Sequence, residues 1–470
     1  MGKGKRKADY TQERKGYLKR VKNLKKPPSA LADPDTFNKE QKPQDPLILN
    51  GRPNDATGLP VALTHPIFGR FSENLYHIEP DKHTAEMVLQ LRKATCSFTD
   101  NDDGYRCNQL LEIINDYTGR RFAPYYFGNR RHTDGSLVQR RGNREIPMAS
   151  IEKKRELGVG GGCPYLQSSA YYIEFIRKFE ADVVRHTRLP MFLLCITGPY
   201  VSISGGAFLG LPVVEPLTPM MPLHCMSDNE GLMTTTIRMF RAFKIALDEL
   251  DLYYKQLMPS PLPLVTPSRP ASPQNIAREY QHKQLTFPYV DRVKIGGADV
   301  EVTYTGKIHD GRHIFKGRVA GRDVVIKFAR RYSRDCHERC HKLGIAPELL
   351  ACERLPGGWF VAVMEWLRDY KTLEQCKCTR NMEKVVRKAV KKMHDAGIVH
   401  GDLRTPNIMI GPQESVMLID FDWAGEKQEA KYPPFMNPNV DWHPDADYGC
   451  EILTQHDEFL LNAELELKLK

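Results

Sequence analysis

CxxC pairs are absent from this 470-residue chain, although it contains eleven cysteines, an odd number. Disulfide frameworks of secreted proteins need paired cysteines, so we expect a reducing intracellular compartment, the nucleus or the cytoplasm. The residues after Met1 are charged and lack the apolar stretch of a secretory signal peptide. The CHERCH motif at 336–341 has no second ligand pair elsewhere, so its spacing does not indicate a zinc site.

An uninterrupted hydrophobic segment is also absent. Residues 189–214 carry no charged side chain, and by length alone they could span a membrane. Three prolines and four glycines divide this stretch into short pieces, which is typical of buried strands and turns. We therefore expect no contact with a membrane.

The net charge of +10 is concentrated at one end of the chain. Residues 1–26 contain eleven Lys and Arg against two acidic residues, a local charge of +9, so the remainder is nearly neutral. The KGKRK motif at 3–7 is typical of nuclear import or of phosphate contacts, so nucleic acid is a candidate partner of this segment alone. We expect residues 1–65 to form a basic, proline-rich, disordered leader.

Proline marks the main domain boundary, because residues 259–273 contain six prolines and can form neither a helix nor a central strand. We therefore predict an N-terminal domain at 66–258, a linker at 259–290 and a C-terminal domain at 291–470. The residue pattern of the N-terminal domain predicts an α/β fold. Its helices are expected at 84–93, 106–117 and 164–188, and its strands at 136–139, 146–154, 191–197 and 200–204.

In the C-terminal domain a single lysine interrupts an apolar strand, Val324-Val325-Ile326-Lys327-Phe328. A lysine inside such a strand needs an anionic partner, and nucleotide phosphates are one such partner. The hairpin upstream of this strand contains Gly306, Gly311, Gly317 and Gly321. A backbone cover over the phosphates of ATP is expected there.

The segment His400-Gly401-Asp402-Leu403-Arg404-Thr405-Pro406-Asn407, followed by Asp420-Phe421-Asp422, gives the clearest functional signal. Asn407 and Asp420 converge if the hairpin between them folds back, and amide and carboxylate oxygens suit Mg²⁺. Asp402 would then face an acceptor hydroxyl and take its proton. Arg404 would stabilise the phosphoryl group in transfer.

These motifs resemble the protein-kinase family, and more closely the fungal protein-kinase-like domains related to crinkler-type effectors. The resemblance rests on VVIKF, RYSRDCHERCHKLGIAP, HGDLRTPNIM and LIDFDWAG. It implies a two-lobed α+β fold and a Ser/Thr protein kinase that uses ATP and Mg²⁺. By the same likeness the acidic partner of Lys327 is Asp335, with Glu338 as the alternative.

Three departures from the kinase pattern bear on the substrate. Gly401 replaces the arginine that clamps a phosphorylated activation segment, and Asp422 replaces the glycine of the metal-binding triplet. Only 48 residues follow Asp422, without an APE-like anchor, so we expect a shortened C-terminal lobe. The expected acceptor is a protein, with a small molecule as the alternative.

A second candidate site lies in the N-terminal domain, where Asp134 precedes a hairpin that carries Glu152 and Lys154. Two carboxylates and a lysine are the groups that a magnesium-dependent nuclease needs, and residues two apart on a strand share a face. Gln167, on the helix that follows, could point to the same place. The alternative is an ordinary pair of surface charges.

The segments IEKKRELGVGGGCPYLQSSAYY and MFLLCITGPYVSISG resemble restriction-endonuclease-like domains of fungal crinkler-like proteins. Thr133 stands where such domains often have proline, and the acid of the first helix is either Glu86 or Glu112. The resemblance implies a DNA nuclease as the alternative function, with a kinase-like domain that binds nucleotide for regulation. A nuclear binding module with two inactive sites is the third hypothesis.

Overall fold

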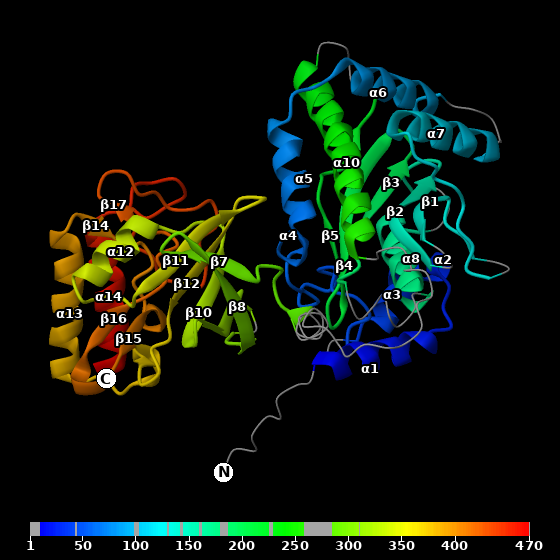
Figure 1. Ribbon diagram of the computed structural model, residues 1–470. Coiled ribbons are helices and arrows are strands. Elements are labelled where there is room, and N and C mark those ends of the chain that lie inside the picture. Colours follow the sequence, from blue (N-terminus) through cyan, green and yellow to red (C-terminus); the bar gives the residue numbers. More distant parts are fainter. Residues whose placement is uncertain are drawn as a thin grey trace. The chain divides into compact units, whose positions relative to one another are not determined.

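The computed structural model describes residues 10–42, 45–97, 103–128, 131–141, 144–158, 162–178, 187–224, 229–257, 284–309 and 311–469. The chain divides into two compact units, Met1–Tyr289 and Val290–Lys470 (Figure 1). This division falls one residue before the start expected for the C-terminal domain. Most of the predicted linker, residues 259–283, lies outside the described part of the chain.

The N-terminal unit is built on a six-stranded sheet in which β1 to β5 follow one another in order and β6 pairs with β4. The strands are β1 (Gly135–Arg141), β2 (Arg144–Lys154), β3 (Met191–Thr197), β4 (Tyr200–Phe208), β5 (Pro212–Pro216) and β6 (Met221–Pro222). Strands β2 and β3 are parallel, and α8 (Pro164–Lys178) lies between them in sequence, whereas the other pairs are antiparallel. The charge-free segment is therefore sheet, and no described helix is long and apolar enough to cross a membrane.

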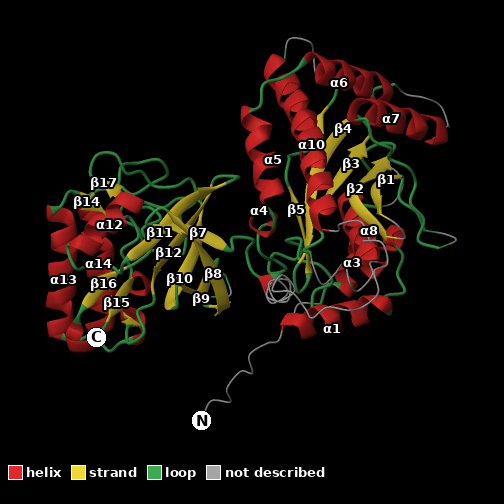
Figure 2. Cartoon of the chain, in the orientation of Figure 1, coloured by secondary structure: helices red, strands yellow, loops and turns green. Residues whose placement is uncertain are grey.

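Helices cover both faces of this sheet (Figure 2). A Cβ atom at Gly205 of β4 would lie 2.9 Å from the ring of Phe68 in α5 (Pro66–His77). At the next residue, Gly206, it would lie 3.2 Å from the ring of Tyr172 in α8. Successive residues of a strand point to opposite faces, so α5 and α8 lie on opposite sides of β4. The same unit also contains α4 (Val61–Thr64), α6 (Lys82–Thr95), α7 (Asp103–Thr118) and α10 (Glu230–Leu257).

The expectation of a disordered leader is wrong for its described residues. They contain α1 (Tyr10–Lys22), α2 (Pro28–Leu31) and α3 (Pro34–Glu40). Tyr17 and Val21, one helical turn apart, are buried in the core, and the Tyr17 hydroxyl donates to the Leu47 carbonyl at 2.9 Å. The guanidinium of Arg14 lies 4.4 Å from the centre of the Phe208 ring. The high charge of α1 thus conceals an amphipathic helix.

The C-terminal unit begins with a six-stranded antiparallel sheet in the order β11-β12-β10-β9-β8-β7. Its strands are β7 (Arg292–Ile295), β8 (Ala298–Lys307), β9 (Ile314–Val319), β10 (Arg322–Ala329), β11 (Leu349–Leu355) and β12 (Trp359–Glu365). Helix α12 (Arg334–Lys342) follows β10. Lys327 therefore lies in a central strand, between β9 and β12.

A mainly helical part follows this sheet (Figure 1). Its helices are α13 (Arg380–Asp395), α14 (Thr454–Leu469), and the short η1 (Leu373–Gln375), η2 (Thr405–Asn407) and η3 (Pro412–Glu414). Its strands are β13 (Lys371–Thr372), β14 (Ile398–Val399), β15 (Ile408–Ile410), β16 (Val416–Leu418) and β17 (Gly425–Glu426). Antiparallel pairing of β15 with β16 folds back the chain between Asn407 and Asp420, as the motif required.

Truncation of Tyr17 tests whether α1 belongs to the folded core. Tyr17→Ala should lower the free energy of unfolding by about 3–5 kcal/mol, because it removes a buried ring together with a hydrogen bond. Urea denaturation followed by circular dichroism measures this change. Lys19→Ala, an exposed position on the same helix, should change stability by less than about 0.5 kcal/mol. Equal effects of the two substitutions would contradict the described packing.

Candidate active site

Lys327 is buried beside two carboxylates. Only 7% of the residue is exposed, and its Nζ atom lies 2.6 Å from Asp420 Oδ1 and 2.6 Å from Asp422 Oδ1. Burial alone would lower the pKa of Lys327, but these two aspartates raise it. The lysine is therefore charged and held in place, as its position in an apolar strand required.

Neither acidic residue expected on the helix is this partner. Asp335 of α12 is 75% exposed at its side chain and pairs with Arg339 at 3.4 Å. Glu338 pairs with Arg334 at 2.7 Å. The prediction that Asp335 holds Lys327 is thus wrong in this structure, because α12 turns its carboxylates toward its own arginines.

Asp420 follows β16 in a backbone conformation that few residues other than glycine adopt, with φ of 72°. Its Oδ2 atom accepts a hydrogen bond from Arg312 Nη1 at 2.9 Å. Burial would raise the pKa of Asp420, but Lys327 and Arg312 lower it below its usual range. The pKa of Asp422 is raised. Burial raises it most, Lys327 lowers it, and the nearby negative charge of Asp420 raises it again. Asp420, the predicted metal ligand, therefore ionises more readily than Asp422, and both carboxylates contact the ammonium group of Lys327.

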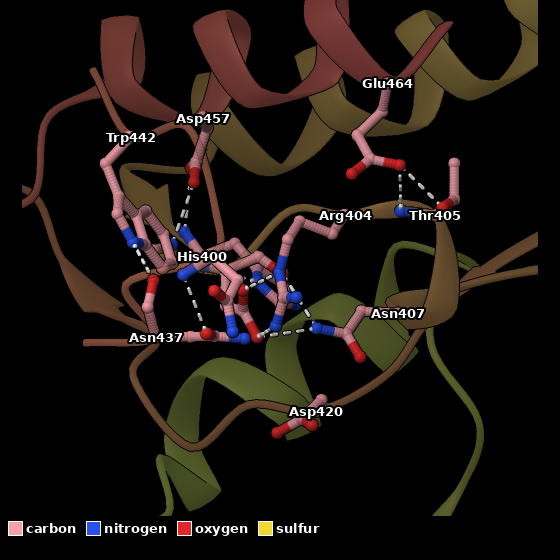
Figure 3. A network of polar contacts seen from close by, with 12 residues as sticks. His400, Arg404, Thr405, Asn407, Asp420, Asn437, Trp442, Asp457 and Glu464 are labelled. Atoms are coloured by element: carbon pink, nitrogen blue, oxygen red, sulfur yellow. Dashed lines mark hydrogen bonds and ion pairs between the residues drawn. The ribbon is translucent and has the colours of Figure 1, made fainter. Parts of the chain in front are cut away.

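Arg404 and Asn407, both labelled in Figure 3, form hydrogen bonds with Asp402. Arg404 forms a two-pronged ion pair with it, from Nε to Oδ1 at 2.5 Å and from Nη2 to Oδ2 at 2.9 Å. The Nδ2 atom of Asn407 donates to the Asp402 carbonyl at 2.8 Å and to Oδ2 at 2.9 Å. Since the Asn407 nitrogen is engaged, its Oδ1 atom is the one suited to a cation.

Two acidic residues of α14, not predicted from the sequence, fix this loop (Figure 3). Asp457 is fully buried and accepts hydrogen bonds from the backbone nitrogens of His400 and Gly401, both at 2.8 Å. Glu464 accepts a hydrogen bond from the Thr405 hydroxyl at 2.6 Å. The sequence did contain a signal, because the positions three and four residues after Asp457 are leucines that face the core.

Gly401 has a structural reason to be glycine. Its φ is 82°, and a Cβ atom there would lie 2.8 Å from Ile452 Cδ1 and 3.3 Å from Trp423 Cβ. An arginine would be strained and would collide with both neighbours. The position where protein kinases have the arginine that clamps a phosphorylated segment therefore has no room for an arginine in this chain.

One cavity of about 400 Å³ joins these groups. It is lined by residues of β9, β10, the loops that carry Asp402 and Asp420, and the segment after Asp422: Gly311, Arg312, His313, Ile314, Lys327, Phe328, Asp402, Arg404, Asp420, Asp422, Trp423, Phe435 and Asn437. Of the four hairpin glycines, Gly311 alone lines it, whereas Gly317 makes room for Ile326 and Gly321 forms a turn with φ of 78°. Five of the predicted site residues thus line this cavity, namely Gly311, Lys327, Asp402, Arg404 and Asp420. Asn407 lies beside it, bonded to Asp402, and Asp335 is not among the lining residues.

A magnesium ion fits the Asn407 and Asp420 pair only with help from a ligand. Within the described residues, no group of three or more His, Cys, Asp or Glu side chains could hold a metal. Mg²⁺ in phosphotransferases is commonly bound by one or two protein oxygens together with substrate phosphates.

The CHERCH motif has a packing role in this structure. His337 of this motif is buried against Phe421, with their ring centres 4.5 Å apart and the rings nearly parallel.

The residues of the second candidate site, in the N-terminal unit, also lie close together. Lys154 Nζ donates to Gln167 Oε1 at 2.8 Å and lies 3.6 Å from Glu152 Oε1. Asp134 Oδ2 accepts a hydrogen bond from the Lys153 amide at 2.6 Å. Burial, and then the nearby Asp134, raise the pKa of Glu152 well above its usual range. The four predicted residues therefore converge at the start of β1, the end of β2 and α8.

Two details of the second site differ from the expected nuclease pattern. Glu86 and Glu112, the alternatives for the acid of the first helix, are both exposed. Thr133 is fully buried and hydrogen-bonds Ser136 Oγ at 2.7 Å, so it supports the turn that carries Asp134. Glu152 is 3% exposed, and its Oε2 atom has no hydrogen-bond partner among the described residues.

Comparison with known proteins concerns the C-terminal unit. Residues 345–440 match the protein kinase domain family, and this range includes Asp402, Asn407 and Asp420. The serine/threonine-protein kinase PKH2 of Candida albicans is 25% identical over 26% of this chain and 13% of its own length. The hormonally up-regulated neu tumor-associated kinase of Homo sapiens is 23% identical over 32% of this chain and 22% of its own length. The chain thus spans less than a quarter of either relative.

Asp457 gives a direct test of how the catalytic loop is supported. Asp457→Ala should destabilise the protein by about 3 kcal/mol, because two buried backbone N–H groups lose a charged acceptor. Chemical denaturation monitored by tryptophan fluorescence measures this loss. The neighbouring Glu458, 65% exposed at its side chain, is the matched control, and Glu458→Ala should be nearly neutral. A neutral Asp457→Ala would show that the loop does not depend on α14.

Proposed function

We propose that the C-terminal unit transfers the γ-phosphoryl group of ATP to Ser or Thr hydroxyls of a protein, with Mg²⁺ as the cofactor. The protein kinase domain at 345–440 supports phosphotransferase activity. The observation that carries the proposal is the convergence of Lys327, Asp402 and Asp420 on one cavity, with Asn407 bonded to Asp402. A relative that matches part of this chain is named a serine/threonine-protein kinase, which favours these hydroxyls as acceptors.

Each residue has a distinct task in this reaction. Lys327 would bind phosphate oxygens, and Asn407 Oδ1 and Asp420 would hold Mg²⁺, which would supply positive charge beside the triphosphate. The acceptor oxygen bonds to the γ-phosphorus as the bond to the bridging β,γ-oxygen breaks, and Asp402 takes the hydroxyl proton. Arg404 gives up one of its bonds to Asp402 when the acceptor arrives, and the N–H group released stabilises the phosphoryl group.

A small-molecule acceptor is the alternative for the same site. Trp423, Phe435 and Asn437 line the cavity, and Phe435 is 89% exposed, so an aromatic wall stands beside the catalytic loop. Phosphate transfer from radiolabelled ATP to Ser/Thr peptides, compared with transfer to small polyhydroxylated compounds, separates the two acceptor classes. Labelled peptide supports the protein kinase.

A second activity, magnesium-dependent cleavage of DNA, is proposed for the N-terminal unit. The convergence of Asp134, Glu152 and Lys154 supports it, because two carboxylates can hold a cation beside a phosphate and the lysine can offset developing charge. Exposed lysines of α1, such as Lys15 and Lys19, are available for phosphate contacts, whereas Arg14 is buried. Nuclear localisation is part of this proposal. The alternative function for the whole chain is a DNA nuclease whose C-terminal unit binds nucleotide for regulation and transfers no phosphate.

The catalytic assignment is tested by two substitutions that should separate binding from chemistry. Asp402→Asn should leave the affinity for ATP and Mg²⁺ within about twofold of wild type and lower kcat by about 10²-fold or more, because the carboxylate acts on the acceptor. Asp420→Asn should weaken magnesium-dependent ATP binding as well, because it removes a metal ligand. Calorimetry and radiolabel transfer measure the two effects. Parallel loss of binding and rate in Asp402→Asn would contradict its role.

The nuclease proposal is tested on plasmid DNA with Mg²⁺ or Mn²⁺. Wild-type protein should nick the plasmid, and Lys154→Ala should abolish nicking, because it removes the group proposed to offset charge on the scissile phosphate. Lys178→Ala, which changes an exposed lysine of α8, should nick normally. Phosphate transfer by the C-terminal unit should be unchanged in both variants. Inert wild-type protein, or a Lys154→Ala variant that cleaves normally, would refute nuclease activity at this site.

A further inference from the structure

We propose that Asp422 is a positioning residue that keeps Lys327 in place for the phosphates, in the role that a helix carboxylate performs in ordinary kinases. This inference rests on the phosphotransferase function proposed above. It starts from a departure in the sequence, because Asp422 stands where the metal-binding triplet has glycine. The structure places that extra carboxylate against the lysine, with Asp422 Oδ1 at 2.6 Å from Lys327 Nζ.

The usual partner of such a lysine is missing because α12 does not supply one. Both candidate carboxylates of this helix are engaged elsewhere, Asp335 with Arg339 and Glu338 with Arg334. The side chain of Asp335 is 75% exposed, whereas that of Lys327 is 9% exposed. A buried ammonium group without a nearby anion costs free energy, so Lys327 needs a carboxylate from another part of the chain.

Asp420 cannot fill this role during the reaction. It contacts Lys327 in the structure, but as the metal ligand its charge is shared with Mg²⁺ once the nucleotide has bound. Asp422 then remains to fix the ammonium group while the phosphates approach. Two carboxylates on one lysine thus have separate tasks, one for the metal and one for the lysine.

Local packing fixes Asp422 in the required position. The preceding residue, Phe421, is fully buried, and its ring is stacked on His337 of α12 at a centroid distance of 4.5 Å. His337 is held in turn by hydrogen bonds to the Tyr332 hydroxyl at 2.6 Å and the Pro347 carbonyl at 3.0 Å. The lysine and its carboxylate therefore meet with α12 in the position that it has in this structure.

The test compares ATP binding by the full chain with and without Mg²⁺. Asp422→Asn should weaken ATP binding by about tenfold, in EDTA and in Mg²⁺ alike, because it acts through the lysine. The Mg²⁺ concentration that gives half-maximal phosphate transfer should not change. Asp335→Asn and Glu338→Gln, the matched controls on α12, should bind and turn over ATP as wild type does.

A double-mutant cycle decides whether the effect passes through Lys327. In a Lys327→Ala background, Asp422→Asn should cause no further loss of ATP affinity, and additive losses would overturn the inference. A loss seen only with Mg²⁺, or unchanged affinity in Asp422→Asn, would also overturn it, the former by making Asp422 a metal ligand. Asp422→Glu, which keeps the charge, should recover part of the affinity and guards against a folding defect in Asp422→Asn. A wild-type chain that neither binds nor uses ATP would instead refute the phosphotransferase function.

Discussion

The buried ammonium group of Lys327 is the constraint on which the catalytic unit depends. A cation in the middle of an apolar strand is tolerated only beside anions, and it brings the segment after β16 against β10. That contact places Asp420 at the cavity and Phe421 in the core against α12. The sheet, the helix and the loop of the proposed metal site are thus tied together by one ammonium group and the two carboxylates that contact it.

Buried acids organise the other half of the site in the same way. Asp457 accepts hydrogen bonds from the two backbone N–H groups that precede Asp402, and so α14 fixes the loop that carries Asp402, the proposed proton acceptor. Arg404 satisfies the carboxylate of Asp402 with two hydrogen bonds. The residues of the proposed active site are therefore held by hydrogen bonds to charged groups, which are stronger than neutral ones and fix the geometry of the loop.

Short motifs could be predicted from the sequence, whereas the contacts between residues far apart in the sequence could not. The strand with Lys327, the segment from Asp402 to Asn407 and the strands at 191–204 were predicted because their patterns are local. The partner of Lys327 was predicted wrongly, because which carboxylate reaches a lysine depends on the orientation of α12. The amphipathic nature of α1 was hidden by its lysines, and Asp457 was missed because its partners lie more than fifty residues away.

The measurement that tests this account most directly is a crystal structure of the full chain with a non-hydrolysable ATP analogue and Mg²⁺. We predict a metal ion bound by Asn407 Oδ1 and Asp420, phosphate oxygens at Lys327 Nζ, and Asp402 facing the γ-phosphate. A nucleotide bound away from the cavity lined by Lys327 and Asp420, or a metal that contacts neither Asn407 nor Asp420, would contradict the central claim.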